Sequence, residues 1–246
     1  PIKSSAASDV YKRQVMLNAF YRSLPGFACP MQVVNDAELA HYTVTGGTGV
    51  VVISGTGSIA YGRSRDGRTC RTGGWMFTIE GDEGSGTWVS RMALRQVGRY
   101  LEGAAPESPL TRAVCATLSI HTRDDLNSVA LAGGQAPWGM PHLGKLVNES
   151  AEEGDVAAVK ILQQAAGLIA LLVEDNVAAL NLTETEPDFI IGLWGSSLLY
   201  SRIMLDACRT RLQQKFPRAI IRMPNRTATE GAADWAWKLT KTNNEL

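Results

Sequence analysis

Cysteine is scarce in this chain of 246 residues, and its four cysteines are scattered. Cys29, Cys70, Cys115 and Cys208 form no Cys-x-x-Cys pair and share no paired Cys/His spacing, so a zinc or iron–sulfur site has little support. The sequence also shows no secretory signal pattern. Together with the scattered cysteines, this predicts a protein of the reducing cytoplasm.

A bias in charge and a long apolar run are missing as well. Lysine and arginine together number 24, as do aspartate and glutamate, so no basic field argues for a nucleic-acid partner. The longest uncharged helical stretch, residues 161–173, is too short to span a bilayer, and it predicts a buried helix with no membrane partner. With 45% hydrophobic residues, the composition is that of a globular protein with one large domain or two small ones.

The first 14 residues stand apart from the rest of the chain. Residues 1–14 show neither apolar periodicity nor a targeting pattern, and they resemble the translated adapter sequence that can appear at the end of an assembled reading frame. We therefore expect these residues to be a non-native leader. On that interpretation the native protein begins upstream, and the chain is a fragment.

A glycine-rich turn is the first chemical signal. Gly55, Thr56, Gly57 and Ser58 lie between apolar runs, which predicts a tight turn in a β-hairpin. Glycines there leave backbone N–H groups uncovered, and the hydroxyls beside Gly57 add donors, so such a turn can approach a phosphate closely. A plain hairpin turn uses the same residue types, so this block alone is compatible both with a phosphate-binding turn and with a purely structural turn.

A second glycine-rich block lies just downstream. The letters GGW at residues 73–75 are followed by GDEGSG at residues 81–86, and then by a predicted helix with apolar side chains on one face. Either Asp82 or Ser85 can cap this helix. The glycines around the acidic pair exceed what a cap needs, and they indicate backbone held close to a polar ligand.

In this order, SGTGS, GGW and GDEGSG resemble the N-acetylglucosamine kinase and glucosamine kinase branch of the BadF/BadG/BcrA/BcrD-type ATPases, within the actin-like ATPase superfamily. The resemblance covers most of the chain from residue 15 onward. It implies an α/β, actin-like ATPase (ribonuclease-H-like) fold, with one complete half and a remnant of the other. The expected order of elements, a β-meander and then alternating helices and strands, supports the same fold independently.

The resemblance divides the chain into two parts. Residues 15–46 would be a remnant of the N-terminal ATPase domain, and residues 47–227 the C-terminal ATPase domain. The last helix, within residues 228–246, is expected to pack on the remnant through at least one of Trp235 and Trp237. Within the remnant we expect a short strand, residues 31–34, and then a helix whose first residues form a capping box that includes Glu38.

The resemblance also implies roles for single residues. Asp36, after the short strand, would be the catalytic base that contacts the sugar and accepts the proton of its hydroxyl, while a helix cap is the alternative. Gly74, Trp75 and Asp82 match sugar-contacting positions, with a core tryptophan as the alternative for Trp75. The residues implied to hold ATP are Gly55, Thr56, Gly57 and Ser58 at the phosphates, and Gly192, Gly195 and Ser196 beside adenosine.

Two departures from the family pattern bear on the site. Met76 replaces the glycine that usually follows GGW, and residues 77–80 lengthen the run to GDEG, which leaves the shape of the sugar pocket open. The acidic, glycine-rich turn that would place Mg²⁺ and the β- and γ-phosphates does not occur before residue 36. No residue of this chain is therefore assigned as a metal ligand.

The implied activity is phosphorylation of an amino sugar, N-acetylglucosamine or glucosamine, at its 6-hydroxyl, with ATP and Mg²⁺, by a fragment that we expect to be inactive alone. One alternative is an activator ATPase of the 2-hydroxyacyl-CoA dehydratase or benzoyl-CoA reductase type, with a cysteine-bound cluster at a dimer interface. Another is a non-catalytic sugar-binding regulator. A homodimer is compatible with the resemblance, and the sugar itself is not fixed.

Overall fold

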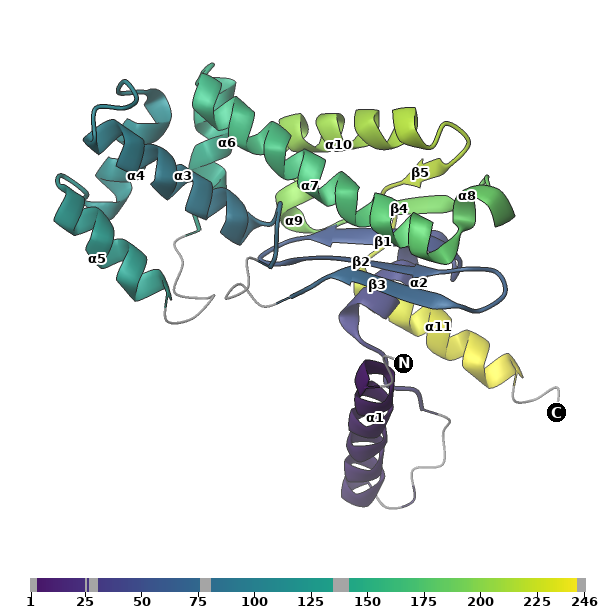
Figure 1. Cartoon of the computed structure of the whole chain (residues 1–246). Coiled ribbons are helices and arrows are strands. Elements are labelled where there is room, and N and C mark those ends of the chain that lie inside the picture. The colour runs from purple at the N-terminus through teal and green to yellow at the C-terminus, as the bar shows by residue number, and fades with distance from the viewer. Residues whose placement is uncertain (1–3, 25, 27–30, 76–80, 135–141, 243–246) are drawn as a thin grey trace.

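A five-stranded mixed sheet is the centre of the protein, in a computed structural model that describes residues 4–24, 26, 31–75, 81–134 and 142–242 (Figure 1). The strands are β1 (Gly49–Ser54), β2 (Ser58–Arg63), β3 (Thr69–Gly73), β4 (Ile190–Trp194) and β5 (Ile220–Arg222). In the order β3-β2-β1-β4-β5, the first three are antiparallel neighbours, and β4 and β5 extend the sheet in parallel from β1. The structure confirms the predicted meander and the α/β class.

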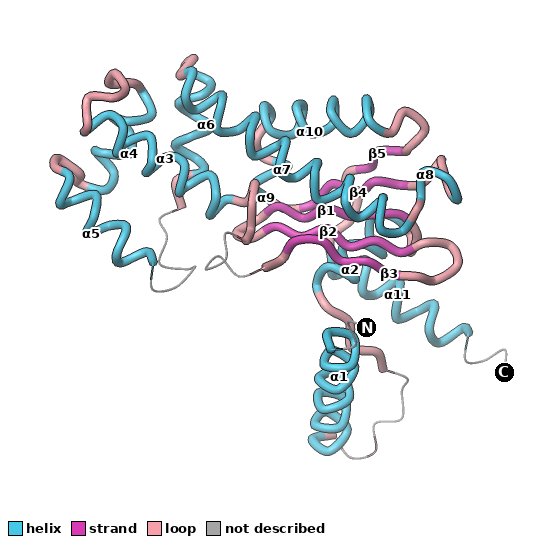
Figure 2. Tube along the Cα trace, viewed as in Figure 1, coloured by secondary structure: helices cyan, strands magenta, loops and turns pink. Residues whose placement is uncertain are grey.

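Helices lie on both faces of the sheet (Figures 1 and 2). The four helices concerned are α2 (Asp36–Thr45), α7 (Val156–Leu180), α10 (Arg202–Lys215) and α11 (Ala228–Thr242). α2 packs on one face and carries α11 on its outer side, whereas α7 packs on the other face with α10 alongside. β1 lies between these layers, and its run Val50, Val51 and Val52 is fully buried, as expected for a β-branched central strand.

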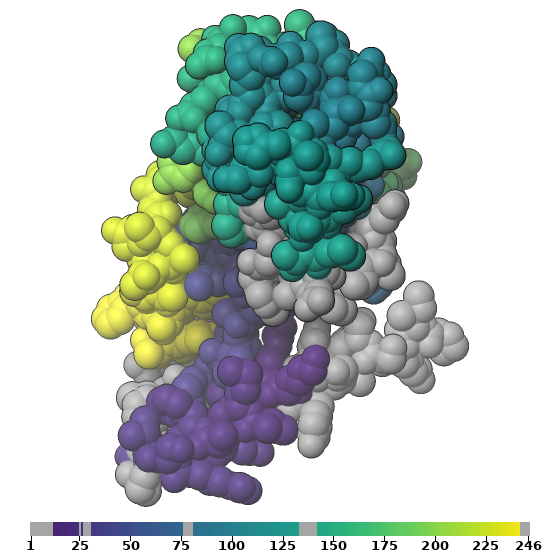
Figure 3. Space-filling view, turned by 90° about the vertical axis from the view of Figure 1, so that its left-hand side faces the viewer, coloured from purple at the N-terminus to yellow at the C-terminus, as the bar shows by residue number. Residues whose placement is uncertain are grey.

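A group of helices extends beyond one end of the sheet. They are α3 (Gly86–Leu101), α4 (Pro109–Leu118), α5 (Arg123–Gly134) and α6 (Gly144–Glu152). Figure 3, viewed from that end, shows these teal helices as one continuous mass above α11 and α1. α3 joins this group to the sheet, because its buried face includes Val89, Ala93 and Val97, which belong to the same core cluster as β1.

Four elements differ from the sequence prediction. Residues 31–34 form no strand, because they lead directly into α2, which lies on a face of the sheet and does not extend its edge. From the sequence we expect a single helix over residues 198–216. The structure divides this stretch into α9 (Ser196–Leu199) and α10, whose cap Ser201 accepts a hydrogen bond from Met204 N (3.3 Å). α5 and α6 were not predicted, because glycines and prolines recur through residues 103–144 and disfavour a helix assignment there.

The N-terminal helix α1 (Ser4–Ser23) runs through most of the expected leader and continues into the expected domain remnant. Arg13 Nη2 donates to Glu38 Oε1 of α2 at 2.6 Å. α8 (Leu182–Thr185) is a single turn after α7. The leader and the division into two domains stay predictions.

The packing of α11 on α2 joins two ends of the described chain. Trp235 stacks on Tyr42 with 4.6 Å between the ring centroids, and Tyr42 Oη donates to Asp234 Oδ2 at 2.6 Å. Trp237, by contrast, is 63% exposed. Of the two tryptophans proposed for this contact, Trp235 is the one that makes it.

α7 is the longest helix in the described chain, and by length and composition it is apolar enough to cross a membrane. Its apolar stretch is therefore longer than residues 161–173. The helix nevertheless packs on β1, β2 and β3, with Ala165, Ile169 and Val173 fully buried. Asn176 Nδ2 also donates to Cys70 O of β3 (3.2 Å), so α7 is fixed to the meander as a core helix.

His41 of α2 is buried against the start of β1, and burial lowers the pKa of its imidazole from 6.5 to about 4. Its Nε2–H donates to Gly49 O at 3.0 Å, and its ring meets Tyr61 edge-on. A depressed histidine pKa means that the unfolded state binds the proton first as pH falls. The stability that neutral His41 provides is therefore present above pH 6.5 and is lost between pH 6.5 and 4.

We expect the free energy of unfolding to be about 2 kcal/mol lower at pH 5 than at pH 7 on account of His41 alone. Urea titrations at both pH values measure this difference. In His41→Gln, which has no titrating ring, the difference should shrink by that amount. An equal pH dependence in the two proteins would contradict the prediction.

Candidate active site

The phosphate turn, residues 55–58, connects β1 to β2 at the end of the sheet that faces α3. Its carbonyl groups are held by neighbouring elements: Gly86 N and Ser197 Oγ both donate to Gly55 O at 2.8 Å. Thr87 Oγ1 donates to Thr56 O, also at 2.8 Å. Within the residues that the structure describes, neither the Thr56 nor the Gly57 N–H donates a hydrogen bond. The turn therefore offers backbone donors to an anion.

The GDEGSG block is bound to the phosphate turn. Asp82 Oδ1 accepts a hydrogen bond from Ser58 N (2.9 Å), and Ser58 Oγ donates to Glu83 O (2.7 Å). The Asp82 backbone is left-handed, with φ of 61°. A Cβ on Gly57 would lie 2.5 Å from Asp82 Oδ1, so a larger residue at this position would displace the Asp82 carboxylate. Ser85, rather than Asp82, caps α3, because its Oγ accepts from Trp88 N (3.2 Å).

A third loop, between β4 and α9, completes one side of the phosphate turn. Gly195 has φ of 99°, and a Cβ there would lie 2.3 Å from Ser54 O, so only glycine permits the loop to pass so close to β1. Ser196 and Ser197 follow, and Ser197 makes the bond to the turn given above. The predicted adenosine residues Gly195 and Ser196 therefore lie next to the predicted phosphate residues.

Gly192 lies inside β4, three residues before Gly195. It is buried and pairs with Val51, and a Cβ on it would lie 2.9 Å from Val44 Cγ1 of α2. Close packing of α2 on the sheet explains this glycine without a ligand. A contact between Gly192 and ATP stays a prediction.

A hollow of about 300 Å³ opens beside the phosphate turn. Gly86 and Ser196, the first residues of α3 and α9, line it. Four further lining residues were not indicated by the sequence motifs: Lys145, Asn148, Tyr200 and Met204. Tyr200 is 87% exposed and offers a ring at its rim. Lys145 and Asn148 come from α6, which no sequence signal connects to this loop.

The GGW segment lies on the other side of the phosphate turn. Gly74 N donates to Ser58 O at 2.8 Å, so the predicted sugar loop is attached directly to the predicted phosphate turn. Trp75 is 66% exposed, which excludes the core-tryptophan alternative. Met76 and the lengthened run at residues 77–80 lie outside the described residues.

Asp36 is the first residue of α2. Asn35 is the N-cap, because its Oδ1 accepts from Glu38 N (2.7 Å) in the capping box that the sequence predicts, so the cap alternative for Asp36 is wrong. Asp36 is exposed, and its Oδ1 accepts only from Ala37 N (2.9 Å) among the described residues. The carboxylate therefore faces solvent at the start of a helix.

Topology brings Asp36 towards the phosphate turn. α2 ends at residue 45 and β1 begins at residue 49, so the short connection makes the helix run back along β1. Ten helical residues span about 15 Å, and six strand residues about 20 Å. Near the connection, His41 already contacts Gly49, the first residue of β1. The start of α2 and the end of β1 consequently share one end of the sheet.

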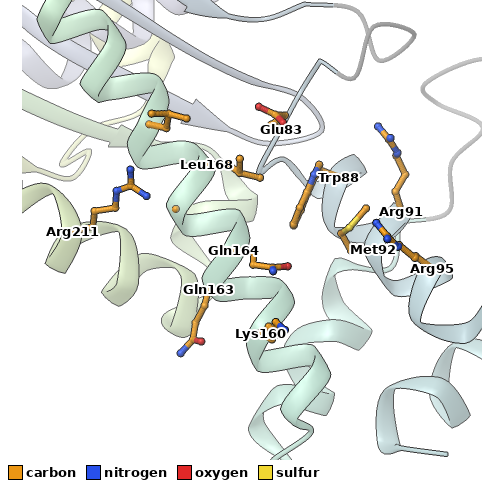
Figure 4. Close-up of a pocket in the computed structure, with 12 residues that line it drawn as sticks. Glu83, Trp88, Arg91, Met92, Arg95, Lys160, Gln163, Gln164, Leu168 and Arg211 are labelled. Carbon is orange, nitrogen blue, oxygen red and sulfur yellow. The ribbon is translucent and has the colours of Figure 1, made fainter. Parts of the chain in front are cut away.

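A basic groove of about 780 Å³ lies elsewhere, over α3, α7 and α10. Figure 4 shows Arg91 and Arg95 on α3, Lys160 on α7 and Arg211 on α10 around it. None of the predicted phosphate, adenosine or sugar residues lines this groove. We therefore place the candidate active site at the phosphate turn.

Sheet order and site together define the class of the protein: an α/β ATPase of the actin-like type, with a glycine-rich phosphate turn between its first two strands. Residues 7–236 match the model of the BadF/BadG/BcrA/BcrD ATPase family. The chain belongs to that family. The predicted resemblance and fold are thereby confirmed.

Two curated relatives are sugar kinases by name. The chain is 30% identical over 229 residues to the N-acetylmuramic acid/N-acetylglucosamine kinase of Clostridium acetobutylicum, covering 91% of this chain and 72% of that protein. It is 29% identical over 228 residues to the N-acetyl-D-glucosamine kinase of Dictyostelium discoideum, covering 92% and 71%.

Solved structures agree with this placement. A candidate N-acetylglucosamine kinase of Chromobacterium violaceum superposes with a TM-score of 0.65 at 27% identity, over 88% of this chain and 69% of that one. A ROK family glucokinase of Streptomyces griseus, solved with glucose and AMPPNP, gives a TM-score of 0.51 over 90% and 72%. At 19% identity, the second likeness shows the fold alone.

Proposed function

We propose that this protein phosphorylates an amino sugar at its 6-hydroxyl with ATP, and that N-acetylglucosamine is its first candidate substrate. One observation carries the proposal: the phosphate turn, the GDEGSG block, the GGW segment and the loop after β4 meet at one end of the sheet. The named relatives are sugar kinases, which favours this activity over the activator-ATPase alternative.

The residues around the phosphate turn fit a nucleoside triphosphate. ATP supplies the phosphoryl group when bound, and Mg²⁺, to which we assign no residue of this chain, neutralises its phosphates. The Thr56 and Gly57 N–H groups position the phosphates, and Ser196 and Tyr200 flank the nucleoside in the 300 Å³ hollow. Glycine at residues 57 and 195 provides the close backbone approach that such a cradle needs.

The sugar is held on the opposite side of the turn. Trp75 offers an exposed ring to the apolar face of the sugar, and Asp82 keeps a second carboxylate oxygen for the sugar hydroxyls while Oδ1 accepts from Ser58 N. Asp36 accepts the proton of the 6-hydroxyl. Its carboxylate is exposed to solvent at the start of α2, where a sugar hydroxyl can reach it.

The cellular setting belongs to the proposal. We place the reaction in the cytoplasm, where scattered thiols stay reduced. Among the described cysteines, Cys70, Cys115 and Cys208 are free. A homodimer stays a prediction, and size measurement of the purified protein decides it.

From the longest reading frame that contains this chain we expect amino-sugar-dependent ADP release at least tenfold above the rate without sugar, and from the chain alone we expect none. The assay compares N-acetylglucosamine, glucosamine and N-acetylmuramic acid, and is run on this chain and on the longest reading frame that contains it. ADP release that no hexosamine stimulates in either form would refute the kinase. Iron in the purified protein would support the activator ATPase, and sugar binding without turnover would support the regulator.

A further inference from the structure

Arg71 occupies the face of the sheet on which α2 lies. It pairs with Tyr61 across β2 and β3, so the two side chains share a face. Tyr61 meets the ring of His41 on α2, at 5.3 Å between centroids. Thr72, the next residue, donates to Leu172 O of α7 on the opposite face (2.7 Å). The Arg71 side chain is thus on the side of the sheet where Asp36 begins α2.

The guanidinium of Arg71 lies along the GGW segment. Its Nη2 donates to Gly74 O at 3.1 Å. A Cβ on Gly74 would lie 2.6 Å from Nη2 and 3.3 Å from Nε, so the side chain fills the space that glycine leaves. Since Gly74 N also donates to Ser58 O, a positive charge stands beside both the predicted sugar loop and the phosphate turn.

Of the four arginines in the meander, Arg63 and Arg71 make no ion pair among the described residues, and Arg71 is the one that is bonded to the GGW segment. Arg65 pairs with Glu186 and Asp188, and Arg68 pairs with Asp66 at 2.8 Å. For Arg71, no carboxylate lies within 4.0 Å among the residues that the structure describes. A guanidinium has five N–H donors in a planar fork that matches a carboxylate, and the bond to Gly74 O uses one of them.

We infer that Arg71 is a specificity-determining residue that binds a carboxylate on the sugar, so that the enzyme accepts an acidic N-acetylamino sugar such as N-acetylmuramic acid. The inference rests on the proposed kinase function. A neutral sugar gives this cation no anionic partner, whereas the lactyl carboxylate of N-acetylmuramic acid can accept a bidentate pair. The Clostridium relative is named for activity on both kinds of sugar.

The test measures kcat/KM for N-acetylmuramic acid and for N-acetylglucosamine in the longest reading frame that contains this chain, which is the parent, and in its variants Arg71→Gln and Arg71→Lys. Losing a hydrogen-bonded charge pair should lower kcat/KM for the acid about 10- to 100-fold in Arg71→Gln. We expect less than about a threefold change for the neutral sugar. Arg71→Lys keeps the charge but not the fork, so its loss for the acid should be intermediate.

Arg95→Gln, in the basic groove on α3, is the matched control: it removes the same charge and should leave both values unchanged. An equal loss for both sugars in Arg71→Gln would overturn the inference and assign Arg71 to the loop or the phosphoryl group. A parent enzyme that phosphorylates only the neutral sugar would also overturn it, while leaving the kinase proposal intact. A parent that phosphorylates no sugar refutes the kinase proposal itself.

Discussion

Replacing Asp36 with asparagine should lower kcat for the sugar kinase reaction about 10²- to 10⁴-fold, with little change in the melting temperature. Asparagine keeps the shape of the side chain and can still accept from Ala37 N, but it cannot take the proton of the sugar hydroxyl. The stability cost should be about 0.5 kcal/mol, because only a charge at the helix N-terminus is lost. Steady-state kinetics and thermal melts on the same preparation measure both effects.

Asp124 provides the matched control. It is an exposed carboxylate in the first turn of α5, as Asp36 is in α2, but it lies in the helical group away from the predicted sugar residues. Asp124→Asn should therefore keep its kcat. If Asp36→Asn also turns over at a near-native rate, Asp36 is not the base, and the role of α2 is only to cover the sheet.

Substituting alanine for Gly195 should lower the free energy of unfolding by about 3 to 5 kcal/mol. The added Cβ would lie 2.3 Å, 2.5 Å and 2.7 Å from the backbone O, C and N of Ser54. These are main-chain atoms of the central strand, so no side-chain rotation relieves the overlap. The loop must move away from β1, and the contact of Ser197 with the phosphate turn is lost with it. Urea unfolding at constant pH measures the change.

Gly154 separates the cost of the overlap from that of the backbone conformation. It has φ of 89°, close to that of Gly195, but a Cβ there meets no atom within 4 Å. Gly154→Ala should therefore cost only about 1 kcal/mol, the price of a left-handed residue other than glycine. Equal losses in the two variants would show that the close approach to Ser54 contributes nothing.

Local signals in the sequence predicted much of the site. The hairpin around residues 55–58 follows from glycines between apolar runs, and the capping box of α2 follows from Asn35 and Glu38. Ser85 was one of two candidates for the cap of α3. Each of these features depends on residues close together in the chain, where spacing alone specifies the hydrogen bond.

Other features depend on distant parts of the chain, and spacing does not predict them. Ser58 N donates to Asp82, whose backbone is left-handed. An aspartate in the sequence does not by itself predict that conformation. Asn148 lines the hollow of about 300 Å³ because α6 packs against α3 and α7. Trp75 could be assigned to the surface only after burial was known, since a tryptophan fits a core or a sugar equally well.

The contact between Tyr42 and the last helix also bears on how the protein matures. Tyr42 and Asp234 are 192 residues apart, and β1, made early, pairs with β4, made late. A chain emerging from the ribosome therefore exposes the outer side of α2 and one edge of β1 long before α11 and β4 exist. Contacts of such long range slow folding, because a large loop must close before they form. The carboxylate proposed as the base is thus synthesised well before α11, and its helix gains the contacts on its outer side only when α11 has been made.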